Sequence, residues 1–374
     1  MTNAFDQVND LMEEGVGNVF PGGVLRVAVE GKEVFHRPFG TLRPRGQGTP
    51  VRHGTVFDTA SLTKCVSIAS LIMKGVDEGW CDLSTNVCKK LGPIGGHAEM
   101  PLHLLLSHRS GLPNWRPYLD WLFERHSDIE PGTDEAIALM KQWILNEPLV
   151  NEVNQLAHYS DLGYMILGWW LEETMGDSLN HLFETHVAKP LRMKSTRYIP
   201  TTGWDAVGSF PCQNTMAPAE ICPGRKRLAH GEVHDENAFV LGGIAGHAGL
   251  FSNAEDLGTW ADALMSCHET SGFISRESIR TFWAPIPTPD DSTWRLGFDG
   301  VSPARSSGGR LVNSSGVCHL GFTGASIWID PERKATTVLL TNRVHPSREN
   351  NLIRDFRPVL HDAIWSAIDE THSL

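Results

Sequence analysis

A strand pair at each end of the chain constrains the fold more than any other feature. Residues 23–31 and 33–39 have the pattern of two strands around a Glu-Gly-Lys turn, and residues 325–330 and 335–341 form a second pair around a Pro-Glu-Arg-Lys turn. An isolated hairpin is only marginally stable. We therefore expect both pairs to join in one mainly antiparallel sheet, so that the two ends of the chain lie in one domain.

Helical patterns flank these strands and fill the middle of the chain. Residues 4–16 and 348–368 are expected to form helices that cover the sheet, and a capping box at Ser252–Glu255 predicts a helix that runs to about residue 264. Residues 200–235 lack periodicity and are expected to form a long loop that lines a site. Further helices are expected at residues 102–107, 134–146, 161–175 and 178–187.

These elements together predict an α/β (α+β) fold with an inserted helical region. The sheet domain is expected to comprise residues 1–80 and 240–374 and to carry Ser61. The inserted, mostly helical domain is expected to comprise residues 81–239 and to carry Tyr159.

Ser61 and Lys64 stand in the order S-x-x-K at the head of an apolar run that extends to Gly79. The apolar residues recur at helical spacing, which places Ser61 on the first turn of a buried helix. Residues three apart share a helix face, and a desolvated lysine that has lost its charge can take the proton of a serine. An isolated S-x-x-K is more typical of an N-capped helix with a surface lysine, so the other motifs decide the interpretation.

Composition limits the class of partner and the compartment. The chain has 374 residues and a formal charge of -12, without a dense run of Lys or Arg, which argues against nucleic-acid and anionic-membrane partners. We find no signal-peptide pattern and no segment long enough to span a membrane. Seven cysteines at scattered spacings favour reduced thiols, so a cytoplasmic location is expected.

The histidines do not form a recognisable metal motif. His230 and His234 are four residues apart, but Gly231 lies between them and the chain has no H-E-x-x-H or C-x-x-C pattern. We expect no metal and no cofactor.

Two later motifs fit the chemistry of a serine nucleophile. Tyr159 precedes a predicted helix, and its phenol, with a pKa lowered by the nearby Lys64 ammonium, could act as the base or as a proton relay. His319-Leu320-Gly321 precedes the strand at 325–330, where a sheet edge offers backbone N–H groups to a carbonyl oxygen.

The ordered motifs resemble the serine β-lactamase and penicillin-binding-protein superfamily, in particular its class C β-lactamase-like esterase and peptidase branch. The resemblance spans nearly the whole chain. It implies a β-lactamase/transpeptidase-like fold in which Ser61 is acylated, Lys64 activates it, Tyr159 is the base, and the N–H groups of Ser61 and Phe322 hold the oxyanion. It rests on S-x-x-K, LLLSHRSGL at 104–112, YSDLGY at 159–164, PLRM at 190–193, GHAGLFS at 246–252 and HLGFTG at 319–324.

At the positions expected to contact the substrate, the residues differ from those of relatives that act on β-lactams. Those relatives carry Y-x-N and K-T-G, whereas this chain has Asp161 in place of the asparagine and His319 in place of the lysine, followed by Gly321. These three residues are expected to contact the substrate. With a mostly neutral His319 that gains charge near pH 6 and a negative Asp161, anionic β-lactams should be turned over more poorly than short neutral esters.

The sequence thus predicts a serine hydrolase that cleaves small carboxylic esters or amides through an acyl-enzyme. A D-amino-acid peptidase or weak β-lactamase is the alternative among hydrolases, and an acyltransferase shares every motif. A catalytically idle ligand-binding protein of the same fold is the alternative from another class; the retained Ser61, Lys64 and Tyr159 argue against it. The expected partner is a small ester, amide or peptide, and the oligomeric state is open.

Overall fold

The predicted sheet is present and joins the two ends of the chain. The computed structural model describes residues 4–43, 48–201, 215–287 and 292–372. Its main sheet has five antiparallel strands in the order β2-β1-β10-β9-β8, with β1 from the N-terminal pair next to β10 from the C-terminal pair. The pairing register places Val24 opposite Leu340. The strands are β1 (Gly22–Val29), β2 (Lys32–Gly40), β8 (Val317–Leu320), β9 (Ser326–Asp330) and β10 (Ala335–Thr341).

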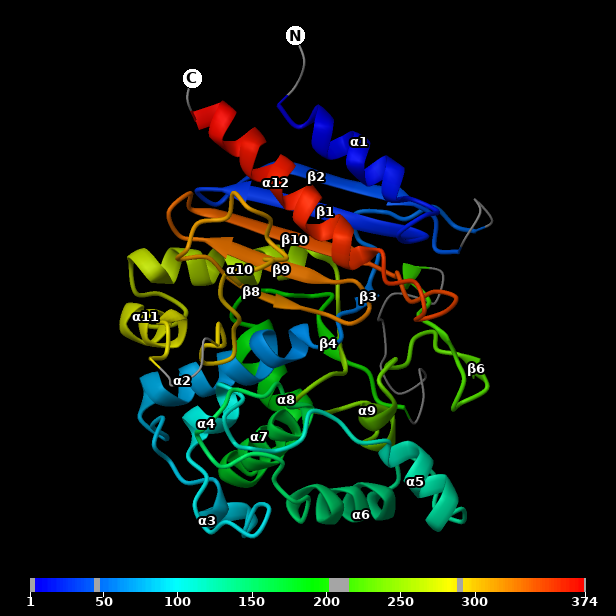
Figure 1. The fold of residues 1–374 in the computed structure, drawn as a ribbon, viewed down its shortest axis with the longest axis vertical. Helices are drawn as coiled ribbons and strands as arrows, with labels where there is room; N and C mark the ends of the chain where they lie inside the picture. Colours follow the sequence, from blue (N-terminus) through cyan, green and yellow to red (C-terminus); the bar gives the residue numbers. More distant parts are fainter. Residues whose placement is uncertain (1–3, 44–47, 202–214, 288–291, 373–374) are drawn as a thin grey trace.

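Each face of the sheet packs against its own set of helices (Figure 1). Helices α1 (Asp6–Gly15) and α12 (Ile353–His372) lie on one face, and α10 (Ala254–Glu269) lies on the other. Alternate strand residues enter different cores: Leu25 joins the α1–α12 side, whereas Val24 joins the larger core beneath α10. Because successive side chains of a strand point to opposite faces, the sheet has a hydrophobic core on each face. Helices α1 and α12, the sheet, and α10 therefore form three layers.

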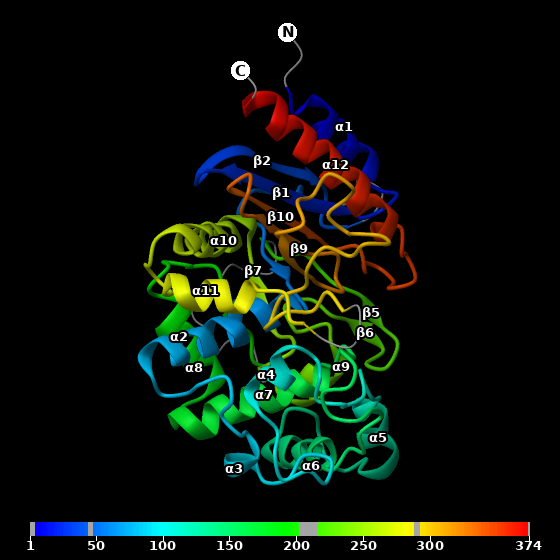
Figure 2. The ribbon, with the colours of Figure 1, turned by 60° about the vertical axis from the view of Figure 1, so that its left-hand side comes forward.

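A helical region lies beyond α10 and forms the other half of the molecule (Figures 1 and 2). At its centre is α7, which is buried along residues 162–171. The helices of this region are α2 (Ser70–Glu78), α3 (Cys88–Leu91), α4 (Leu102–Leu106), α5 (Tyr118–Arg125), α6 (Asp134–Leu145), α7 (Asp161–Met175), α8 (Leu179–Phe183), α9 (Glu236–Val240) and α11 (Arg276–Trp283).

Short strands connect the two halves. A three-stranded sheet in the order β3-β7-β4 and a two-stranded β5-β6 ribbon lie between the main sheet and the helices. One continuous hydrophobic core includes Val338 of the main sheet and Leu167 of α7. The division into two domains stays a prediction. The short strands are β3 (Phe57–Asp58), β4 (Arg197–Tyr198), β5 (Ile221–Cys222), β6 (Arg227–Leu228) and β7 (Leu250–Ser252).

Two local predictions are corrected by the structure. The run after Ser61 is not one α-helix: a π-helical turn, η1 (Lys64–Ala69), precedes α2, and a second π-helical segment, η2 (Glu184–Ala188), follows α8. Such turns shift the side-chain register and are frequent at functional sites. The cap of α10 is Asn253, whose Oδ1 accepts from the Asp256 N–H, because the extended strand β7 still includes Ser252.

No helix among the described residues is long and apolar enough to cross a membrane. The six cysteines that the structure describes are free thiols. Part of the predicted loop at 200–235, residues 202–214, lies outside the described residues, and the remainder carries β5 and β6.

Candidate active site

A constrained turn presents Ser61 at the end of β3. Ala60, the residue before it, has a φ of 48°, in the left-handed region that a residue with a Cβ seldom adopts. Asp58 holds this turn: one carboxylate oxygen accepts from the Ala60 N–H at 2.8 Å and the other from the His234 N–H at 2.7 Å. Thr323 donates its hydroxyl to the Asp58 carbonyl at 2.8 Å. Asp58 therefore connects the serine turn to two distant segments.

The structure brings Ser61, Lys64 and Tyr159 within hydrogen-bonding distance. The Lys64 Nζ and the Tyr159 hydroxyl each lie 2.9 Å from the Ser61 Oγ. Lys64 is fully buried, and Tyr159 comes from the segment just before α7, 98 residues along the chain. The serine oxygen thus has two polar hydrogen-bonding groups within reach.

Lys64 is held more tightly than the sequence indicates. Its Nζ lies 2.7 Å from Asp161 Oδ1 and donates to the carbonyl of His247 at 3.0 Å. Lys64 therefore has three polar partners: it forms hydrogen bonds with Ser61 and the carbonyl of His247, and an ion pair with Asp161. Asp161, expected to contact the substrate, both lines the pocket and neutralises Lys64.

The expectation of a lowered Tyr159 pKa is wrong. Burial of the phenol, with the negative charge of Asp161 next in importance, raises its pKa well above the usual value of 10. The ring packs against His108 at 4.5 Å and Trp294 at 5.1 Å between ring centres. Because a buried phenolate would lose hydration beside a carboxylate, Tyr159 is neutral near pH 7.

The expectation that His319 gains charge near pH 6 is also wrong. Its side chain is only 2% exposed, and Nδ1 is 3.0 Å from the Leu320 carbonyl. Burial, and then repulsion from Lys64, lowers the pKa of His319 to about 3. Its ring lies against Trp294 and is not among the residues that line the pocket.

The backbone at Gly321 and Phe322 closes the site opposite Ser61. Gly321 packs so closely on Thr59 that a Cβ there would meet the Thr59 carbonyl oxygen at 2.5 Å, which explains why this position is glycine. The Gly321 N–H donates to the Ala325 carbonyl at 2.7 Å. Within the described part of the chain, the N–H groups of Ser61 and Phe322 have no hydrogen-bond acceptor, so both are available to a ligand.

A pocket of about 540 Å³ opens at Ser61. Asp161 and Gly321, two of the three residues expected to contact the substrate, line it together with Tyr159 and Phe322. Another wall contains His234 and Asp235, at the end of the loop expected to line a site, together with residues that the sequence did not indicate because they belong to no motif. The residues of this wall are His234, Asp235 and Glu236 from the start of α9 and Arg343, Arg348, Arg354 and Arg357 from the segment after β10 and from α12.

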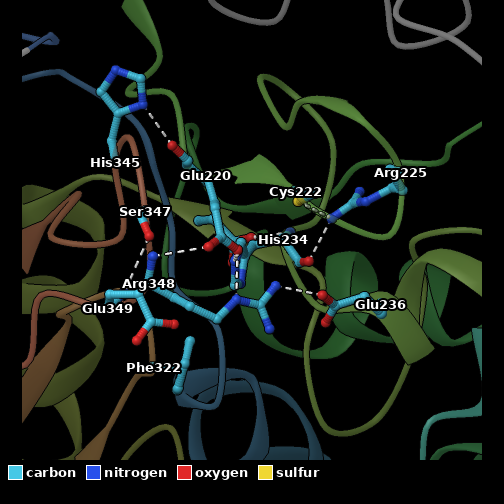
Figure 3. Close-up of polar contacts among 12 residues, drawn as sticks. Glu220, Cys222, Arg225, His234, Glu236, Phe322, His345, Ser347, Arg348 and Glu349 are labelled. Atoms are coloured by element: carbon cyan, nitrogen blue, oxygen red, sulfur yellow. Dashed lines mark hydrogen bonds and ion pairs between the residues drawn. The ribbon is translucent and has the colours of Figure 1, made fainter.

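A network of ion pairs supports this wall (Figure 3). The Glu220 carboxylate is 2.9 Å from His234 Nε2 and 2.6 Å from Arg348 Nε, and Arg348 also pairs with Glu236. Hydrogen bonds from these groups lower the pKa of Glu220 to about 2 despite its burial. The His234 ring stacks on Phe322, 5.7 Å between ring centres. The network therefore fixes the ring beneath the exposed Phe322 side chain.

The same network includes a group that could hold a metal ion. Ligand atoms of Glu220, Cys222 and His234 lie within 4.8 Å of one another. However, Arg348 already forms an ion pair with Glu220, and Arg225 donates a hydrogen bond to Cys222 Sγ at 3.0 Å (Figure 3). A divalent cation there would face two guanidinium groups, so the cluster fits an ion-pair network better than a metal centre.

Comparison with known proteins agrees with this geometry. A model of the Beta-lactamase family matches residues 8–358. The chain belongs to this family. The curated relatives of the chain carry the names of hydrolases, and this protein is likewise a serine hydrolase.

Two curated relatives and one solved structure illustrate the range of the family. The "N-acetylmuramyl-L-alanine amidase" of Bacillus subtilis (strain 168) is 28% identical over 369 residues, covering 92% of this chain and 82% of the relative. A "Putative D-alanyl-D-alanine carboxypeptidase" of Escherichia coli O157:H7 is 26% identical, covering 91% and 82%. The structure of "EstCE1, a hydrolase with promiscuous acyltransferase activity" covers 97% of this chain and 98% of its own, with a TM-score of 0.75 and 19% identity, and supports the fold alone.

Proposed function

We propose that Ser61 is the acylated nucleophile, that its proton passes to Tyr159 and Asp161, and that Lys64 stabilises the charge on its oxygen. The observation that carries this proposal is the position of Ser61 Oγ, 2.9 Å from both Lys64 Nζ and the Tyr159 hydroxyl at the base of the pocket. A serine hydroxyl needs a neighbouring group to take its proton before it attacks a carbonyl carbon.

The raised pKa of Tyr159 makes it a relay and not a standing phenolate. As Ser61 Oγ bonds to the carbonyl carbon, its proton moves to the Tyr159 oxygen, which releases its own proton toward the Asp161 carboxylate. The Lys64 ammonium, 2.9 Å from the serine oxygen, stabilises the charge that develops there. When the tetrahedral intermediate collapses, Asp161 returns its proton to Tyr159 and Tyr159 passes one proton to the leaving group, which leaves the acyl group on Ser61.

The N–H groups of Ser61 and Phe322 are the donors for the carbonyl oxygen in this proposal. A preorganised donor pair commonly contributes a factor of ~10² to 10³ in rate per donor. Water completes the cycle by attacking the acyl-enzyme. An alcohol in place of water would make the protein an acyltransferase, the alternative that the sequence leaves open.

The substrate proposed is a small ester, amide or peptide. The names of the relatives, an amidase and a putative D-alanyl-D-alanine carboxypeptidase, support amide bonds in peptides as candidates besides esters. A cytoplasmic location stays a proposal supported by the free thiols of the described cysteines.

The test is to trap the acyl-enzyme. The protein is mixed with p-nitrophenyl butyrate, quenched in acid within the burst phase, and analysed as intact protein and as peptides by mass spectrometry. We expect one butyryl group on the peptide that contains Ser61, and none in Ser61→Ala. A butyryl group retained on another residue of Ser61→Ala, with hydrolysis intact, would contradict the proposal.

A further inference from the structure

A histidine–aspartate pair lies next to the active-site pocket and has no part in the proposed proton transfers. His247 Nε2 is 2.8 Å from Asp235 Oδ1, and Asp235 lines the pocket that opens at Ser61. The His247 side chain is buried, with only 1% of the residue exposed. Because an ionised carboxylate can only accept hydrogen bonds, the imidazole is the donor in this pair.

The Asp235 carboxylate is fixed in place. It caps α9, where its Oδ1 also accepts from the Ala238 N–H at 2.8 Å. Burial alone would raise the pKa of Asp235, but the interactions with His247 and with the Ala238 N–H outweigh it and lower that pKa below the usual value. The carboxylate is therefore ionised at neutral pH. In the part of the chain that the structure describes, it is the only hydrogen-bond partner of the His247 ring, whose Nδ1 is buried without one.

The backbone of His247 contacts the lysine of the active site. The His247 carbonyl accepts from Lys64 Nζ at 3.0 Å, and the same Nζ is 2.9 Å from Ser61 Oγ. A displacement of about 1 Å in an active-site contact can cost about 10²-fold in rate. The position of this carbonyl therefore matters for the position of the Lys64 charge relative to the serine oxygen.

The chain on either side of His247 is held by its own contacts. Gly246 packs so closely on α7 that a Cβ there would meet the Tyr164 carbonyl oxygen at 1.9 Å. After His247, the Leu250 N–H donates to Thr63 Oγ1 at 3.2 Å. These contacts fix the two ends of a short loop. Within the loop, the side-chain hydrogen bond of His247 is the contact that orients residue 247 and its carbonyl.

The segment that carries Asp235 also supports the turn before Ser61. The N–H of His234 donates to Asp58 at 2.7 Å, and Asp58 holds that turn. Two consecutive residues are thus connected to the two groups that meet at the serine oxygen. One is connected to the nucleophile through the backbone, and the other to Lys64 through its side chain.

We propose that the Asp235–His247 pair is a positioning pair for Lys64. By orienting the His247 carbonyl, the pair keeps Lys64 Nζ at hydrogen-bonding distance from Ser61 Oγ. The inference rests on the proposed function, because it requires that Lys64 stabilises the charge on the serine oxygen. Loss of the pair should slow acylation with little effect on substrate affinity, since His247 is not among the described residues that line the pocket.

Stopped-flow acylation by p-nitrophenyl butyrate measures the rate constant and the substrate dissociation constant separately. His247→Ala should lower the acylation rate constant by about tenfold and change the dissociation constant by less than about twofold. His247→Gln places an amide N–H near the position of Nε2 and should recover most of the rate. Asp235→Asn keeps an acceptor oxygen but loses the charge, so its rate should lie between those of His247→Ala and wild type.

Asp256→Ala is the matched control for a general loss of stability. Asp256 is a buried carboxylate on α10 whose Oδ2 accepts from the Ser195 N–H at 2.7 Å and the Thr196 hydroxyl at 2.8 Å. This variant should lower Tm as His247→Ala does and leave the acylation rate unchanged. If His247→Ala is unfolded at the assay temperature, His247→Leu, which fills more of the buried space without a donor, takes its place. A wild-type acylation rate in the His247 variant, or an equal loss in Asp256→Ala, overturns the proposal.

A double-mutant cycle with Lys64→Met separates the positioning role from the proposed function. Lys64→Met alone should slow acylation by about 10²-fold or more. In that background, His247→Ala should cost less than about twofold, because no ammonium is left to position. A tenfold cost of His247→Ala in both backgrounds overturns the positioning role and leaves Lys64 in the mechanism. Acylation of Lys64→Met at the wild-type rate overturns the role of Lys64 in the proposed function and the inference with it.

Discussion

Lys64 Nζ lies closer to Asp161 Oδ1, at 2.7 Å, than to Ser61 Oγ, at 2.9 Å. The lysine of the S-x-x-K motif is therefore one half of a buried ion pair. A carboxylate at this distance attracts the lysine side chain electrostatically. In the proposed mechanism the proton of Ser61 therefore passes through Tyr159, and Asp161 serves both as the partner of Lys64 and as the proton acceptor.

Ser61→Ala should remove ester hydrolysis while leaving the fold intact. Loss of an activated nucleophile costs about three orders of magnitude or more in kcat. The measurement is steady-state hydrolysis of p-nitrophenyl acetate beside thermal unfolding. Ser266→Ala, an exposed serine on α10, is the control and should retain full activity. A Ser61→Ala rate above about a tenth of wild type contradicts the assignment.

Tyr159→Phe should slow acylation by ~10² to 10⁴, the usual contribution of a positioned proton-transfer group. In the wild type, the raised pKa of Tyr159 keeps the phenol protonated and able to relay a proton, so the acylation rate should be flat between pH 7 and pH 9. Stopped-flow release of p-nitrophenolate between pH 6 and 10 measures this rate. Tyr118→Phe, which changes a buried tyrosine that hydrogen-bonds Glu147, should retain the wild-type rate. A rise of about tenfold per pH unit across this range would show that a phenolate is the base and would contradict the relay.

Asp161→Asn should slow acylation by ~10² or more. In the proposed relay the Asp161 carboxylate takes the proton that Tyr159 releases, and the amide of asparagine cannot take it. Lys64 also loses its charge partner, and we expect the free energy of unfolding to fall by about 1–3 kcal/mol. Glu173→Gln breaks an exposed ion pair with Lys141 and should cost less than about 1 kcal/mol. A wild-type acylation rate in Asp161→Asn removes Asp161 from this role.

The ratio of activity on anionic and neutral esters should be flat from pH 5 to pH 8. A histidine whose pKa is lowered to about 3 is neutral above that value, so His319 adds no charge in this window. Hydrolysis of 3-carboxyphenyl butyrate and of 3-carbamoylphenyl butyrate is compared at constant ionic strength. His319→Gln should leave the shape of the profile unchanged. A step of the wild-type ratio near pH 6 that disappears in His319→Gln would show that His319 titrates there after all.

Asp58→Ala should lower kcat more than it raises KM, because Asp58 positions the serine turn without lining the pocket. Two backbone N–H groups, of Ala60 and His234, lose their acceptor, so we expect a loss of about 2 kcal/mol or more in unfolding free energy and of about tenfold or more in kcat. Asp58→Asn retains one carbonyl oxygen and should recover part of kcat. Asp82→Ala, at an exposed turn, is the control for losing two such acceptor contacts. Equal kcat in Asp58→Ala and wild type refutes the positioning role.

The sequence by itself determined the features that depend on neighbouring residues. The segments 23–31 and 335–341 are predicted as strands from the residues around their turns, and in the sheet the successive residues Val24 and Leu25 enter different cores. The S-x-x-K spacing places Ser61 and Lys64 on one side of a helical turn, and that proximity survives the π-helical geometry of η1. These relations span a few residues, so local backbone geometry is enough to set them.

Only the tertiary structure decided the charges around the serine. A side chain's protonation depends on its burial and on charges brought near it by folding, which no local spacing encodes. Asp161 meets Lys64 across 97 positions of chain, Tyr159 becomes a neutral phenol, and His319 is buried as a neutral ring. The arginines that line the pocket are the same kind of feature. They belong to no motif, and folding brings Arg343 to the carbonyl of Phe322 and Arg357 to that of Gly321.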